Sequence, residues 1–383
     1  MLGLVPRFKP DYDLRDIVAA LTLSKGKVGQ FESEFAKKFE AKYAVMLSYG
    51  RSGLYSLFSV WHLNKAEIIC PAYTCTVVAD AIILSGNIPV FVDCEKNSFN
   101  MDCDGIKDAI TEKTRCIVAT HLFGYPMDVK KVEQIAIEAG KKYGHKIYVV
   151  QDVAHSFGAR WRGQLVTMFG DAAIFGLGVS KIINSIYGGM VITDNPDTFN
   201  KLVEYRRHNF LKKGPAKSFR RLFFMLAIHL GFNSYVYAFT NWLERKGCLD
   251  RFVKYYYDDK ICFPRDWNDL SLELEARVGL EQLKKYDRIV KNRVDKARRY
   301  IEEFGARQDI RVLPFFEGAT YSHFVALVDG RQSWLERYRR IGINLGILIE
   351  YAVPYLKAYA NYKKTEYPMA KYYSEHVINF PIS

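Results

Sequence analysis

The first half of the chain alternates short apolar segments with stretches of helical periodicity, and this alternation restricts the fold more than any other feature. Several apolar segments are rich in Val and Ile on both faces, as in strands that are buried between helices. The segments lie at 67–70, 88–93, 116–122, 146–152, 172–175 and 190–193. We therefore predict an α/β fold with a mostly parallel central sheet sandwiched by helices.

Two of the intervening stretches show the periodicity of amphipathic helices. One has an apolar stripe at helical spacing that consists of Leu54, Leu57, Phe58 and Trp61. The other covers residues 129–139, and we expect Gly140 to end it as the C-cap.

The alternation stops near residue 200, which suggests a division of the chain into three parts. A long helical pattern opens near residue 269, and short strands and a further helix follow at 321–328 and 334–341. We predict a large domain at 1–200, an insert at 201–260 and a smaller C-terminal α+β domain at 261–383.

The cysteines and the amino terminus bear on the compartment. The seven cysteines are odd in number and contain no C-x-x-C pair, which argues against a zinc site or a disulfide framework and favours free thiols in a reducing cytosol. Residues 1–13 carry charges and prolines but no apolar core of a signal peptide. We expect a cytoplasmic protein without a metal site.

Three motifs carry chemistry, and the first two are single side chains near strand ends. Asp152 and His155 follow the strand predicted at 146–152, where ligands bind in α/β sheets. Taken alone, Asp152 is more readily explained as a residue that caps the following turn. Lys181 follows an apolar, glycine-rich run, where a lysine can lose its proton and form an imine with an aldehyde, or can reach out to water.

The third motif is the turn around Gly50, Arg51 and Ser52, between an apolar strand and the helix described above. Backbone N–H groups at a helix start, a hydroxyl and a guanidinium form a phosphate cradle. A cradle, then an acid, then a lysine could hold one flat cofactor at three points: its phosphate, its ring nitrogen and its aldehyde. This set favours pyridoxal phosphate (PLP).

At these residues the chain resembles the DegT/DnrJ/EryC1/StrS family of PLP-dependent sugar aminotransferases, which have fold type I. The resemblance covers most of the chain, and its blocks occur in the family's order. They are residues 26–36, 48–52, 71–74, 89–93, 121–124, 151–159, 170–171, 180–181, 188–189 and 274–283.

The resemblance implies a role for each site residue. Lys181 would bind the cofactor and move the proton, Asp152 would hold the ring nitrogen, and His155 would touch the ring hydroxyl, where many members carry Gln. Arg51 and Ser52 would hold the phosphate, beside Gly50. Asn268 would reach the phosphate of the neighbouring subunit, which implies a homodimer with shared active sites.

The resemblance also implies a reaction, the transfer of an amino group from glutamate to a keto-sugar nucleotide for surface polysaccharide or related sugars. Another PLP reaction such as sugar dehydration, or a non-catalytic ligand-binding relative, stays open. Related dehydratases replace the lysine by histidine, whereas this chain keeps Lys181. Three positions depart from the family: Cys75 stands where a ring usually stacks on the cofactor, with Tyr73 as a candidate substitute, and Gly176 and Gly178 stand where a serine and a bulky residue are usual.

The insert combines charge and apolarity in an unusual order. Residues 201–221 contain eight Lys and Arg and one acidic residue, Glu204, and residues 222–243 contain no Asp, Glu, Lys or Arg. This layout suits peripheral docking on the inner face of an anionic membrane, and a spanning helix or a buried helical pair are the alternatives. The net charge of +13 also favours acidic substrates, but without a recognition motif we expect no nucleic-acid partner.

Overall fold

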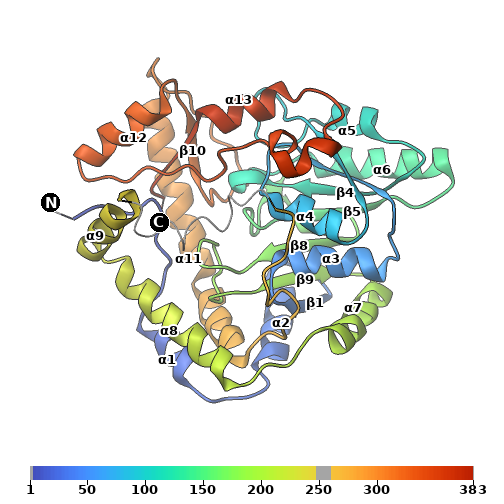
Figure 1. Cartoon of the computed structure of the whole chain (residues 1–383), viewed down its shortest axis with the longest axis horizontal. Coiled ribbons are helices and arrows are strands. Elements are labelled where there is room, and N and C mark those ends of the chain that lie inside the picture. Colours follow the sequence, from blue (N-terminus) through green and yellow to red (C-terminus); the bar gives the residue numbers. More distant parts are fainter. Residues whose placement is uncertain (1–2, 247–259, 383) are drawn as a thin grey trace.

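A seven-stranded sheet forms the centre of the computed structural model, which describes residues 3–246 and 260–382 (Figure 1). The strand order is β1-β9-β8-β5-β4-β2-β3. The strands are β1 (Tyr43–Leu47), β2 (Glu67–Pro71), β3 (Ile88–Val92), β4 (Thr114–Thr120), β5 (Tyr148–Asp152), β8 (Ala172–Gly176) and β9 (Gly189–Thr193). Only β9 pairs antiparallel with its neighbours β1 and β8. The predicted α/β fold with a mostly parallel sheet is confirmed.

Helices cover both faces of this sheet. Successive residues of a strand therefore pack into different buried clusters, one on each face. In β2, Ile68 belongs to one buried cluster and Ile69 to another. The covering helices are α2 (Lys27–Lys38), α3 (Gly50–Val60), α4 (Thr76–Leu84), α5 (Cys103–Ala109), α6 (Val129–Tyr143) and α7 (Pro196–Asn209). A small hairpin of β6 (Arg160–Trp161) and β7 (Gln164–Leu165) and two short helices, η1 (Leu122–Gly124) and η2 (Val166–Met168), complete this part.

The predicted end of α6 at Gly140 is wrong. The helix continues to Tyr143, and its C-cap is Gly144, whose φ of 72° is left-handed. Gly140 instead lies inside the helix against the following chain, where an added Cβ would stand 2.9 Å from the carbonyl oxygen of His145. The glycine is used for close packing, which the helical pattern alone does not distinguish from a cap.

The C-terminal part combines a long helix with a two-stranded antiparallel sheet. The helix α11 (Glu273–Phe304) runs beside β10 (Phe324–Leu327) and β11 (Val377–Phe380). Its other elements are α12 (Arg331–Arg340), η4 (Val353–Tyr355), η5 (Lys357–Tyr362) and α13 (Pro368–His376). The amino-terminal segment also packs here, since Asp16 in α1 (Leu14–Leu21) forms a 2.5 Å ion pair with Lys285 of α11.

The described part of the insert contains two helices after α7, namely α8 (Pro215–Gly231) and α9 (Ser234–Arg245). No single described helix is long and apolar enough to cross a membrane, although α8 and the first part of α9 together meet that test of length and composition across a bend of 102°. The six cysteines in the described ranges are free thiols, and Cys248 lies outside them.

Candidate active site

Asp152 ends strand β5, so its carboxylate lies at the carboxyl edge of the sheet. The side chain is buried, and two groups from that edge fix it. The backbone N–H of Ala154 donates to Oδ1 at 3.1 Å, and the hydroxyl of Thr120, the last residue of β4, donates to Oδ2 at 3.3 Å. The turn-capping contact and a ligand-facing position therefore coexist at this residue.

Lys181 and Asp152 act on each other electrostatically. Burial lowers the pKa of the Lys181 amine and the charge of Arg51 lowers it further, while Cys75 and Asp152 oppose this. Burial raises the pKa of Asp152, against the N–H of Ala154 and the charge of Lys181. The structure thus brings an acid and a half-buried amine with a lowered pKa to one place at the sheet edge.

His155 lies beside these groups with one ring nitrogen unsatisfied. Its Nδ1 is buried and has no hydrogen-bond partner among the described residues. The ring is nearly parallel to that of Phe123, at 21° and 6.1 Å, and its centroid is 5.3 Å from that of His323. Burial and the charge of Lys181 hold the pKa of His155 well below its usual range, so the ring is neutral and available to a ligand.

Sequence reasoning missed two residues of this cluster, Phe123 and His323. Phe123 has a left-handed φ of 56°, and the adjacent Gly124 packs so tightly on Tyr321 that an added Cβ would stand 2.4 Å from its backbone nitrogen. His323 is buried, and the charge of Lys181 acts on it too. A polar Ser-His pair within the apolar segment 321–328 was the one available signal.

The turn at Gly50 begins α3, as predicted. The N-cap residue Tyr49 forms no side-chain cap, so no described side chain caps the first turn of α3, where N–H groups can bind an anion. The guanidinium of Arg51 lies 5.6 Å from the centroid of the Tyr49 ring. The charge of Arg51 acts on Lys181, so the cradle lies near the amine.

Ser52 and Asn268 direct their polar side chains at carbonyl groups of the same chain. The Ser52 hydroxyl donates to the carbonyl of Trp267 at 2.5 Å, and the Asn268 amide donates to the carbonyl of Asn209 at 3.2 Å. The segment that carries Asn268 therefore adjoins the start of α3. Their predicted roles at the phosphate stay predictions.

The structure shows where some of the positions that depart from the family pattern lie. Tyr73 is fully buried in the core and donates to the carbonyl of Ile349 at 3.1 Å, so it lies among core residues. Cys75 is the N-cap of α4, and its sulfur acts on Lys181. At Gly176 an added Cβ would stand 3.4 Å from Cε of Lys181, so the missing side chain leaves space beside the amine.

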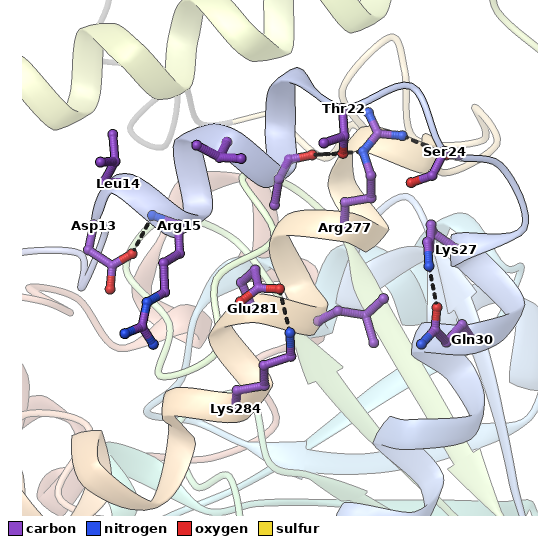
Figure 2. A pocket seen from close by; sticks show the side chains of 13 residues that line it. Asp13, Leu14, Arg15, Thr22, Ser24, Lys27, Gln30, Arg277, Glu281 and Lys284 are labelled. Carbon is purple, nitrogen blue, oxygen red and sulfur yellow. Dashed lines mark hydrogen bonds and ion pairs between the residues drawn. The ribbon is translucent and has the colours of Figure 1, made fainter.

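A separate surface pocket of about 770 Å³ lies between α1, α2 and α11 (Figure 2). None of the candidate site residues lines it. Its most enclosed cation is already bonded, because Arg277 donates to the carbonyls of Ala19 at 2.8 Å and Ser24 at 2.9 Å. The pocket is distinct from the cluster around Lys181.

Comparison with known proteins places this chain in a family. The sequence profile of the DegT/DnrJ/EryC1/StrS aminotransferase family matches residues 12–239 and 268–383. GDP-perosamine synthase of Vibrio cholerae is 24% identical over 397 residues, covering 99% of this chain and 94% of that protein. GDP-4-keto-6-deoxy-D-mannose 3-dehydratase of Yersinia pseudotuberculosis is 27% identical over 292 residues, covering 74% and 66%.

The fold is likewise similar to solved structures. The sugar aminotransferase CalS13 of Micromonospora echinospora superposes with a TM-score of 0.78 at 18% identity, covering 99% of this chain and 95% of that one. At this identity the likeness concerns the fold.

Proposed function

Because the chain belongs to the DegT/DnrJ/EryC1/StrS aminotransferase family, an enzyme family that uses PLP, we propose that it transfers an amino group from glutamate to a keto-sugar carried by a nucleotide. The observation that carries the proposal is the pairing of Lys181, whose pKa is lowered, with the buried Asp152 at the carboxyl edge of the sheet.

The residues present fit the cofactor. The N–H groups at the start of α3 suit its phosphate, Asp152 suits its ring nitrogen, and the unpartnered Nδ1 of His155 suits a ring oxygen. When bound, PLP supplies a ring that accepts electrons from the substrate carbon. Lys181 would hold its aldehyde carbon and, once displaced, move a proton at the substrate carbon.

The protonation state of Lys181 matters for that proton transfer. An amine with an ordinary pKa would be charged near neutral pH and could not accept a proton. Burial and the charge of Arg51 lower the pKa of Lys181 and so favour the neutral amine, which is the form that a general base needs.

The relatives support a nucleotide sugar as acceptor, since both named relatives carry GDP-sugar substrates or products in their names. The net charge of +13 would attract a diphosphate. We further propose that the enzyme is a cytoplasmic homodimer, in which Asn268 of each chain completes the phosphate site of the other, and that its product serves surface polysaccharide or related sugars.

The test uses the purified full-length chain with PLP and glutamate. Without a sugar acceptor, each active site should release about one equivalent of 2-oxoglutarate, because the amino group stays on the cofactor. Addition of a nucleotide-linked keto-sugar should then give an amino sugar that mass spectrometry detects. Lys181→Ala should abolish both steps.

Two other outcomes would replace the proposal. A sugar product that has lost water in place of gaining an amino group would identify a dehydratase. A non-catalytic relative would bind PLP but would release no α-keto acid from glutamate or from other amino acids, and it would convert no sugar.

A further inference from the structure

Helix α8 turns two of its basic side chains, Lys217 and Arg221, inward and exposes two of its aromatic side chains. Lys217 and Met225 are buried, whereas Phe219 and Phe223 are 71% and 68% exposed. Leu222, Phe224 and Ile228 pack against the buried cluster that contains Met225, so apolar side chains occupy the inward face of α8 as well as its outward face. The exposure of these aromatic side chains therefore needs a structural explanation and suggests a function.

The cause is a set of ion pairs that fixes the rotation of α8. Arg221 forms ion pairs with Asp266 at 2.7 Å and with Glu275 at 3.1 Å. Its guanidinium also lies 3.7 Å from the centroid of the Tyr187 ring. Lys217 lies 3.4 Å from a carboxylate oxygen of Asp269. A roll of the helix to hide its aromatic side chains would break these enclosed pairs, which is costly.

Helix α9 continues the exposed apolar stripe and is also anchored. The backbone N–H of Leu4 donates to the carbonyl of Ser234 at 3.1 Å, and the amide of Asn344 donates to the hydroxyl of Tyr237 at 2.7 Å. We name the outward stripe of both helices the α8–α9 surface. It consists of Phe219, Phe223, Leu230, Tyr235, Val236, Phe239 and Trp242, all exposed.

Further apolar side chains lie next to this surface. Helix α1 packs beside α8 along the same side of the molecule (Figure 1). It exposes Leu14, Val18 and Leu21, and the chain after it exposes Leu23 at 92%. Such a concentration of exposed apolar side chains marks an interaction surface.

The charges in the segments that carry the surface are mainly positive, and Asp13 at the N-cap of α1 and Glu244 near the end of α9 are acidic exceptions. No Asp or Glu occurs from residue 205 to 243, and the exposed side chains there include Lys212, Lys213 and Arg220. Arg15 and Lys25 are exposed on and after α1, where the one acidic residue between 14 and 31 is the buried Asp16. The apolar stripe is thus bordered mainly by cations.

We propose that the α8–α9 surface docks on an anionic lipid surface. Aromatic side chains would enter the headgroup region while the bordering cations contact lipid phosphates. The 102° bend and the ion pairs to the folded domain favour helices that lie in the interface over a span across it. A symmetric contact with a second copy would set cationic borders against each other, which disfavours that occupant.

The test measures co-sedimentation of the full-length PLP-loaded chain with sucrose-loaded vesicles. The wild type should bind vesicles of phosphatidylcholine with phosphatidylglycerol about tenfold more than phosphatidylcholine alone. The double variant Phe223→Glu/Phe239→Glu should lose binding by about tenfold or more. The matched control Ile137→Glu, at a 52% exposed position of α6, should bind as the wild type does.

Trp242→Phe is a fourth protein in the comparison. The wild type and all three variants should have the same circular dichroism spectrum and the same visible absorbance of bound PLP, which would show that each is folded. Absence of vesicle binding by the wild type, or equal binding by the double variant, would overturn the proposal. A third result would also overturn it. If sedimentation velocity showed a dimer for the wild type and a monomer for the double variant, with no change in vesicle binding, the surface would be a subunit interface.

Discussion

Gly189 of β9 packs directly against Tyr49, the residue that precedes α3. A Cβ added to Gly189 would stand 2.2 Å from the carbonyl carbon of Tyr49 and 2.3 Å from the nitrogen of Gly50. No side chain fits in this contact, so the antiparallel strand sets the position of the first turn of α3. The N–H groups proposed for the cofactor phosphate are therefore placed by a glycine that does not itself contact the ligand.

Gly189→Ala should move the start of α3 and lower both the cofactor affinity and the stability. We expect a loss of about 1–3 kcal/mol in the free energy of unfolding, because the new methyl group meets backbone and not a flexible side chain. Thermal unfolding and titration of apoprotein with PLP measure the two effects. Gly29→Ala is the matched control, since no atom lies within 4 Å of its added Cβ in α2. Equal behaviour of the two variants would contradict this account.

Sequence patterns predicted those features that depend on local periodicity. The alternation of apolar runs located the strands and the sheet edge where Asp152 lies, because burial on both faces leaves a direct mark on composition. Residues that reach the site through tertiary packing left no such mark. His323 arrives from the C-terminal part, and Phe123 owes its place to a left-handed backbone at the close contact of Gly124 with Tyr321.

The insert shows the same limit. Its basic run predicted a cationic face, but Lys217 and Arg221 form inward ion pairs with acids of residues 266–275. Those partners lie far along the chain, at separations of 45 residues for Arg221 with Asp266 and 54 residues for Arg221 with Glu275. Helical periodicity cannot report pairings over that distance, so the direction of each charge followed only from the fold.

Asp152→Asn should separate catalysis from folding. The amide keeps the shape of the carboxylate and its contacts with Thr120 and Ala154, but it cannot stabilise a protonated ring nitrogen. We expect 2-oxoglutarate release from glutamate to slow by about 100-fold or more. Because burial raises the pKa of Asp152, removal of this charge should leave the apoprotein as stable as the wild type or more so. Unchanged turnover would contradict the assigned role.

Asp80 makes the stability of the protein depend on pH. Burial raises its pKa from 3.8 to about 6, against a hydrogen bond from Tyr359 and the charge of Arg51. The folded state therefore binds this proton more tightly than the unfolded chain does. The resulting stabilisation is present below about pH 4 and is lost as the pH rises through about 6.

Asp80→Asn keeps an acceptor for the Tyr359 hydroxyl, which lies 2.5 Å from Oδ1, and removes the titration. The variant should match the wild type near pH 4 and exceed its free energy of unfolding by about 1–3 kcal/mol at pH 8. Chemical denaturation across that range measures the difference. A difference that does not change with pH would show that Asp80 is not the titrating group.

His155 should act through a hydrogen bond, and two substitutions distinguish this from a packing role. Gln retains a polar group that can reach the cofactor, whereas Phe retains only the ring that packs against Phe123 at 6.1 Å. We expect His155→Gln to stay within about tenfold of the wild-type rate and His155→Phe to fall by about 100-fold.

The pH dependence of the rate gives a second check on His155. Burial keeps the pKa of His155 well below its usual range, so His155 should not titrate near pH 6 to 7. The wild type and His155→Gln should therefore have the same pH profile in that range. Thermal unfolding controls for structure, and His155→Phe should match the wild type there because the buried Nδ1 has no partner among the described residues to lose. If His155→Phe instead kept full activity, the ring would serve packing alone and the hydrogen bond to the cofactor would be excluded.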